Sequence, residues 1–256
     1  MIGQRKTLPR SGRLSKEVPV SVQHKTDTGR HYAGIPIHAA DGVHEYVGYL
    51  TEAELTVDEP ILELGAGSGA LTKRLLDQGC VVAPVDIDGS TWACPGVELT
   101  ILDLNDRDWP QQMLGQYRTV VAVELIEHLE NPRQFMRNLA RVTSPGGTCI
   151  LTTPNVCCSE SIQLLGRKGW LVGFDPEQYR SSGHISILPW WLLCLMAWDA
   201  GFDTVRVDFT GSFDMRGARL ILSRVFARFA RLFQQSVHRV IDDGVVVVMV
   251  LKRRDQ

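Results

Sequence analysis

The sequence lacks several features that would place it in a membrane or outside the cell. It has no run of about 18 apolar residues of the kind that spans a bilayer, and its first residues lack the apolar core of a signal peptide. Its six cysteines form no C-x-x-C pair and show no disulfide-like spacing. The sequence therefore predicts reduced cysteines in a cytoplasmic protein.

The chain also has little net charge. The balance is −2 over 256 residues, so the composition does not demand a nucleic-acid partner. Basic residues nevertheless gather at the start, with seven Lys or Arg against two acids in residues 1–30. We therefore expect a basic, flexible arm over residues 1–40. The remaining length suits one well-buried domain over residues 41–256.

Short apolar runs alternate with amphipathic segments along the chain. Strands that are apolar throughout and alternate with helices are typical of a mostly parallel sheet covered on both faces. We therefore predict an α/β fold, Rossmann-like and doubly wound, with a seven-stranded sheet. The predicted strands are 61–64, 81–85, 97–102, 119–123, 148–152, 205–209 and 245–251; the helices are 41–58, 70–78, 132–142 and 188–200, and a turn is expected at 144–147.

A glycine-rich loop follows the first of these strands. Gly65, Gly67 and Ala70 satisfy the dinucleotide pattern G-x-G-x-x-G/A, in which glycines let the backbone approach a ligand closely. The pattern alone is weak, and it leaves a nicotinamide-dependent oxidoreductase open. Glu63 speaks against a pyrophosphate, because a carboxylate two residues before the first glycine would repel it. The loop therefore favours a cationic or amine-bearing ligand.

Further acids follow the next two strands. Asp86 comes 21 residues after Gly65, where a carboxylate can accept hydrogen bonds from two ribose hydroxyls. Asp103 follows the third strand, where it could meet an adenine amino group. Together with Glu63 these acids line one crevice at the strand ends. That crevice suits a nucleoside with a positively charged tail.

Glu124, Glu127 and His128 follow the fourth strand and allow three interpretations. They could form a turn that holds the loop. They could bind Mg²⁺ or Mn²⁺ together with the distant His184, because residues i, i+3 and i+4 share a helical face and these side chains are metal ligands. Alternatively, His128 or His184 could act as the catalytic base for a substrate hydroxyl, since imidazole titrates near neutral pH.

The motifs in this order resemble those of class I S-adenosylmethionine-dependent methyltransferases, over about residues 40–210. The matching segments are ILELGAGSGALTKRL, VDID, LDLND and VAVELIEHLENPRQFMRNLARVTSPGGTCILTTPN. The resemblance is closest to the group that includes ubiquinone-pathway and saccharide O-methyltransferases. It implies S-adenosylmethionine as cofactor, with methyl transfer to a hydroxyl of a small-molecule or saccharide acceptor.

The resemblance also implies roles for individual residues. Glu63 and the loop residues Gly65, Ala66, Gly67 and Gly69 would meet the methionine part, Asp86 the ribose, and Asp103 with Leu104 the adenine; Ile87 and Glu124 would also border the cofactor. The pattern E-x-x-E-H with a distant histidine resembles the metal site of small-RNA 3′-terminal 2′-O-methyltransferases, where the ion binds the terminal diol. That enzyme is the alternative within methyltransferases, and a non-catalytic scaffold is the alternative outside enzymes.

Two segments carry the remaining expectations. Residues 155–184 form a long insertion over the strand ends, where such loops shape a substrate site. Residues 216–239 hold six arginines and no acids, and their apolar residues, apart from Leu220, fall on one helical arc. This basic amphipathic helix could pack on the domain, lie on a membrane near a lipid-linked substrate, or face RNA. RNA is disfavoured, because no aromatic-interleaved motif accompanies the arginines.

Overall fold

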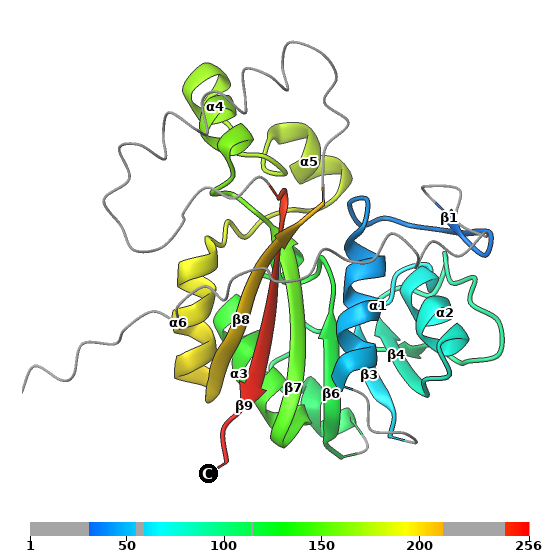
Figure 1. The fold of residues 1–256 in the computed structure, drawn as a ribbon. Helices are drawn as coiled ribbons and strands as arrows, with labels where there is room; N and C mark the ends of the chain where they lie inside the picture. Colours follow the sequence, from blue (N-terminus) through cyan, green and yellow to red (C-terminus); the bar gives the residue numbers. More distant parts are fainter. Residues whose placement is uncertain (1–30, 55–58, 114, 212–243, 256) are drawn as a thin grey trace, which may run out of the picture.

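The computed structural model describes residues 31–54, 59–113, 115–211 and 244–255, and its centre is one seven-stranded sheet (Figure 1). The strand order is β5-β4-β3-β6-β7-β9-β8; β9 runs antiparallel to both of its neighbours, β7 and β8, and the other neighbouring pairs are parallel. This confirms the predicted mostly parallel, Rossmann-like sheet. The strands are β3 (Ile61–Leu64), β4 (Val82–Asp86), β5 (Thr100–Ile101), β6 (Tyr117–Ala122), β7 (Thr143–Pro154), β8 (Phe202–Thr210) and β9 (Val246–Arg253).

Helices cover both faces of the sheet, as predicted. On one face lie α1 (Val43–Glu54) and α2 (Ala70–Asp77), and on the other lie α3 (Pro132–Val142) and α6 (Trp190–Ala200). Strand β9 is buried on both faces. Val248 packs into the core with α1 and α2, while Met249 packs into the core with α3 and α6. Successive side chains of a strand point to opposite faces, so both faces must be apolar.

The order of the strands creates one preferred binding place. From β3 the chain proceeds outward through β4 to β5, then returns to add β6 on the other side of β3. In such sheets a crevice opens beyond the carboxyl ends of the two strands where the direction reverses. The glycine loop follows β3 and Glu124 follows β6, so this topology brings both to the crevice.

Residues 144–147 do not form the expected turn. They lie inside β7, between the pairs Tyr117–Thr143 and Thr119–Thr148, so four residues of β7 face one residue of β6. A β-carbon on Gly147 would lie 2.8 Å from the carbonyl oxygen of Ser144 and 2.9 Å from that of Arg118. The glycine therefore permits a close backbone approach within an irregular strand pair. The prediction failed because turn-forming residues also form bulges.

The last residues of the expected flexible arm are folded onto the domain. Strands β1 (His31–Tyr32) and β2 (Ile35–Pro36) pair as a small antiparallel hairpin. Tyr32 is buried, its hydroxyl donates to Asp77 at 3.1 Å, and the Arg74 guanidinium lies 4.2 Å from the centre of its ring. The hairpin is thereby attached to α2. Residues 1–30 lie outside the described residues, as does the expected helix at 216–239.

The insertion at residues 155–184 contains helices. They are α4 (Ser159–Lys168) and α5 (Pro176–Ser181), which lie above the carboxyl ends of the strands (Figure 1). The structure also has two short 3-10 helices, η2 (Trp109–Gln112) and η3 (Ile126–His128). Within the described ranges no helix is long and apolar enough to cross a bilayer.

Candidate functional site

A cavity of about 640 Å³ lies at the crevice between the ends of β3 and β6. Its volume is in the range of small-molecule and cofactor sites. The walls come from the segment before α1, the glycine loop, the ends of β4 and β6, and the region of α5. The lining residues include Pro36, His38, His44, Glu63, Gly65, Ala66, Gly67, Asp86, Ile87, Glu124, His128, Gln178, Ser181, Ser182 and His184.

The glycine loop is shaped by positive φ angles and by close packing. Gly65, Gly67 and Gly69 have φ of 75°, 55° and 89°, which side-chain-bearing residues rarely adopt. A β-carbon on Gly69 would lie 2.6 Å from Cβ of Cys94, so the position also needs the space. The Gly67 amide donates to Asp86 at 2.8 Å, which joins the loop to the end of β4.

Glu63 is a buried carboxyl at the base of this cavity. It is only 3% exposed, and one of its oxygens accepts a hydrogen bond of 2.6 Å from the Thr72 hydroxyl. Burial raises its pKa to about 8; the Thr72 bond opposes this rise and the nearby Asp86 charge adds to it. A buried acid that gains from a nearby cation suits a ligand with a positive charge, as the sequence predicted.

The two acids expected at the nucleoside part differ in position. Asp86 lines the cavity. The neighbouring Ile87, which is 60% exposed, adds an apolar side chain to the cavity wall. Asp103 and Leu104 do not line this cavity. Leu104 is buried in the core beside α3, and the Asp103 carboxylate accepts from the Asn105 amide at 2.8 Å. Their expected contact with adenine therefore stays a prediction.

Glu124 has an unusual backbone at the end of β6. Its φ is 48°, a left-handed conformation that is rare for a residue with a side chain and often marks a functional site. Thr152 holds it twice: the hydroxyl accepts from the Glu124 amide at 2.9 Å and donates to Oε1 at 3.0 Å. Burial raises the pKa of this carboxyl to about 7, against the lowering effect of the Thr152 bond.

Glu127 is fully buried in η3. Oε2 accepts a hydrogen bond of 3.0 Å from the Thr153 hydroxyl, while Oε1 has no hydrogen-bond partner among the described residues. Its backbone oxygen accepts from the amides of Ile185 and Ser186, which attaches the segment around His184 to this turn. Burial and then the Glu124 charge raise its pKa well above the ordinary value. A buried, half-satisfied carboxyl is costly unless a cation meets it.

Two imidazoles lie beside Glu127. The rings of His128 and His184 are 4.7 Å apart between centres and nearly perpendicular. Nδ1 of His184 lies 2.7 Å from the carbonyl oxygen of Gly173; because a carbonyl only accepts, Nδ1 carries the hydrogen and Nε2 keeps a lone pair. Burial lowers the pKa of both rings, and for His184 the proximity of His128 lowers it further. Both imidazoles are thus favoured in the neutral, metal-binding form.

These three side chains fit a metal ion. Glu127, His128 and His184 each offer one ligand atom, and the three atoms lie within 4.8 Å of one another. The unpartnered Oε1 of Glu127 and the Gly173 bond of His184 are what a carboxylate–imidazole site requires. Among the described residues Glu124 does not belong to this cluster, although the sequence placed it among four expected ligands.

The cavity also includes residues that the sequence did not single out, although residues 38–49 were expected to lead into a helix over the cofactor. Pro36, His38 and His44 come from the segment before and within α1, and the Ser68 hydroxyl fixes this segment by donating to the Pro36 carbonyl at 2.6 Å. No motif marks these residues, because their place depends on how the hairpin packs. Gln178, Ser181 and Ser182 lie within the insertion that was expected to shape the substrate site, and only their identity was missed.

Comparison with known sequences identifies the family. The profile described as a methyltransferase domain matches residues 38–207. Ubiquinone biosynthesis O-methyltransferase of Cronobacter sakazakii is 27% identical over 152 residues, covering 56% of this chain and 58% of the relative. The enzyme of the same name from Pseudomonas aeruginosa is 24% identical over 127 residues, covering 47% and 54%. The chain thus spans little more than half the length of these relatives.

Solved structures agree on the fold. A SAM-dependent methyltransferase from Archaeoglobus fulgidus superposes with a TM-score of 0.58 at 14% identity, covering 83% of this chain and 95% of that one. Magnesium protoporphyrin IX methyltransferase from Synechocystis, solved with bound SAH, gives 0.53 at 17% identity, covering 82% and 81%. Because the family profile covers more than half of the chain, the chain belongs to the methyltransferase-domain family, and its glycine loop, Glu63 and Asp86 border one cavity.

Proposed function

We propose that this protein is an S-adenosylmethionine-dependent methyltransferase that methylates a hydroxyl oxygen of a small molecule or saccharide, and that a divalent metal ion held by Glu127, His128 and His184 takes part. The cluster of these three side chains at the cavity carries the proposal. A divalent ion bound there would supply a Lewis acid that orients a hydroxyl and lowers its pKa. The O-methyltransferase names of the two sequence relatives support the same chemistry.

The polar side chains around the cluster support a hydroxylated acceptor. Gln178, Ser181 and Ser182 line the cavity on the same side as His184, and each offers both hydrogen-bond donors and acceptors. The sulfonium of S-adenosylmethionine is already activated, so the protein mainly aligns the nucleophile with the methyl group and excludes water. These side chains suit the task of fixing the orientation of a hydroxyl.

In this proposal Glu124 accepts the proton and the two histidines bind the metal ion. An imidazole whose lone pair binds an ion has no lone pair left for a proton, so His128 and His184 serve as ligands in this proposal. As the acceptor oxygen bonds to the methyl carbon, the carbon–sulfur bond breaks and its electron pair stays on sulfur. The hydroxyl proton passes to Glu124, whose pKa of about 7 suits a base at neutral pH.

Methyl transfer to a panel of acceptors tests the proposal. Purified enzyme receives S-adenosylmethionine with a labelled methyl group and, separately, catechols, monosaccharides, ribonucleosides or short RNA, with Mn²⁺ or with chelator. We expect an O-methyl product that needs the ion and falls at least about tenfold in Glu127→Gln, a loss of roughly 1.4 kcal/mol in transition-state stabilisation. The matched control is Arg137→Ala, on the exposed side of α3.

Each outcome of this panel has a defined meaning. Label transferred only to the 3′ end of RNA would move the RNA 3′-terminal 2′-O-methyltransferase to first place. An N-methyl product, or full transfer in chelator, would contradict the metal-assisted O-methylation. Glu124→Gln keeps an oxygen that can accept from Thr152, so we expect it to lose turnover while its affinity for S-adenosylhomocysteine is retained.

A further inference from the structure

Two adjacent threonines at the carboxyl end of β7 each hold one acidic side chain of the site. The Thr152 hydroxyl donates to Oε1 of Glu124, and the Thr153 hydroxyl donates to Oε2 of Glu127, both at 3.0 Å. Both threonines are buried, with 0% and 2% of their surface exposed. A hydroxyl has a single hydrogen to donate, so neither threonine can serve both carboxyls at once. Each acid therefore has its own donor.

The position of the Thr153 hydroxyl is set by the sheet. Strand β7 lies between β6 and β9, and Thr153 pairs with Val247 of β9. Threonine is branched at Cβ, which leaves its side chain few rotamers. Glu127, in contrast, lies in the short helix η3 and has three rotatable side-chain bonds. Groups held on strands are placed more precisely than groups on loops, so Thr153 determines where the Glu127 carboxyl lies.

This hydrogen bond makes the two oxygens of Glu127 unequal. Oε2 is occupied by Thr153, whereas Oε1 has no hydrogen-bond partner among the residues that the structure describes. A carboxylate oxygen of Glu127 lies within 4.8 Å of ring nitrogens of His128 and His184. His184 has a comparable outer contact, because its Nδ1 lies 2.7 Å from the Gly173 carbonyl oxygen. Outer contacts of this kind fix the orientation of metal ligands.

We propose that Thr153 is a positioning residue of the metal site, because its hydroxyl fixes Oε2 of Glu127 and so presents Oε1 as the ligand oxygen. Thr153 does not line the cavity and acts only through Glu127. The role rests on the proposed function, since it requires an ion at this cluster. Thr152 has a different role, because it holds Glu124, which lies outside the cluster. Loss of the Thr153 hydroxyl therefore weakens ion binding, whereas loss of the Thr152 hydroxyl mainly reduces turnover.

Calorimetric titration of Mn²⁺ into the full chain, saturated with S-adenosylhomocysteine, tests this role. Thr153→Val keeps the shape of the side chain and removes the hydroxyl, and we expect Mn²⁺ to bind about 10- to 100-fold more weakly, as is usual when such an outer contact is lost. Thr153→Ser restores the hydroxyl and should recover most of the affinity. The matched control is Thr143→Val, which removes the hydroxyl of another buried threonine on β7, one that donates to the Leu139 carbonyl, and which should bind Mn²⁺ as the wild type does.

Circular dichroism and binding of S-adenosylhomocysteine verify that each variant is folded. Thr153→Ala replaces Thr153→Val if the latter does not fold; it leaves room for water to satisfy Oε2 without fixing its direction, so weaker Mn²⁺ binding is expected there too. Wild-type affinity in either variant would overturn the role, as would equally weak binding in Thr153→Ser, Thr152→Val or Thr143→Val. An absence of saturable Mn²⁺ binding in the wild type would instead overturn the proposed function together with this role, so the two failures are distinguishable.

Discussion

Glu63 illustrates how one buried side chain makes the stability of the fold depend on pH. In the folded protein its pKa is about 8, against an ordinary value of 4.5, because burial disfavours the charged carboxylate. Between these two values the folded state holds a proton that the unfolded state has released. The contribution of Glu63 to stability is therefore present below pH 4.5 and is lost as the pH rises towards 8.

The first prediction concerns Glu63→Gln. One group contributes a slope of up to about 1.4 kcal/mol per pH unit, so the wild type should lose roughly 1–2 kcal/mol more than the variant between pH 6 and pH 8. Urea unfolding at the two pH values measures this difference. Glu59→Gln, at an exposed carboxylate, serves as the control and should keep the wild-type slope. Equal slopes for wild type and Glu63→Gln would show that Glu63 is not buried in the neutral form.

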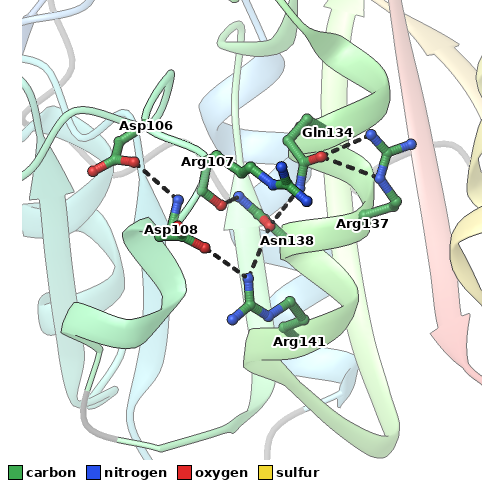
Figure 2. A network of polar contacts seen from close by, with 7 residues as sticks. All are labelled: Asp106, Arg107, Asp108, Gln134, Arg137, Asn138 and Arg141. Carbon is green, nitrogen blue, oxygen red and sulfur yellow. Dashed lines mark hydrogen bonds and ion pairs between the residues drawn. The ribbon is translucent and has the colours of Figure 1, made fainter.

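At the scale of elements, the loop before η2 is fixed to α3 by a buried amide. Figure 2 shows Asn138 of α3 donating to the Arg107 carbonyl, at 2.9 Å, while its side-chain oxygen accepts from Gln134 and Arg141. Asn138 is fully buried. This contact holds the stretch that follows Asp103.

The second prediction concerns this contact. Asn138→Ala leaves the Arg107 carbonyl without its donor, and we expect a loss of about 1–3 kcal/mol in the free energy of unfolding. Arg137→Ala removes only exposed bonds to Gln134 and should change stability by less than about 0.5 kcal/mol. Chemical denaturation of both variants makes the comparison. Equal losses would mean that burial of the amide does not matter.

The elements also show what the sequence determines. The alternation of apolar strands and helices was enough to predict the sheet, because a strand buried on both faces has a distinctive pattern. The spacing from Gly65 to Asp86 likewise located the cavity. Residues 144–147 were misassigned, since glycine and proline serve bulges as well as turns. Pro36 was not predicted, because tertiary packing of the hairpin alone brings it to the cavity.

The expected metal ligands were also only partly predictable from the sequence. Glu127 and His128 are close in sequence, and spacing alone suggested their common face. His184 reaches them through the bonds of the Glu127 carbonyl to Ile185 and Ser186, which no sequence pattern records. Glu124 was grouped with them by the same spacing argument. Its left-handed backbone and its hydrogen bonds to Thr152 hold its carboxylate apart from the cluster of Glu127, His128 and His184, and no sequence pattern indicates this.

For the whole molecule, binding of the cofactor product should stabilise the fold. At a concentration of S-adenosylhomocysteine one hundred times its dissociation constant, we expect a gain of about 2.7 kcal/mol, because the ligand binds the folded state alone. Thermal unfolding with and without the ligand measures it. NAD is the matched control and should give no shift. Stabilisation by NAD instead would return the glycine loop to the dinucleotide interpretation.

The proposed function depends most on a metal ion beside the methyl-transfer site. The most direct measurement is a calorimetric titration of Mn²⁺ into the wild type and into Glu127→Gln, each saturated with S-adenosylhomocysteine. We predict one saturable ion per chain in the wild type, with affinity that rises with pH as protons leave Glu127, and at least about tenfold weaker binding in the variant. No saturable binding, or equal binding in both proteins, would contradict the claim.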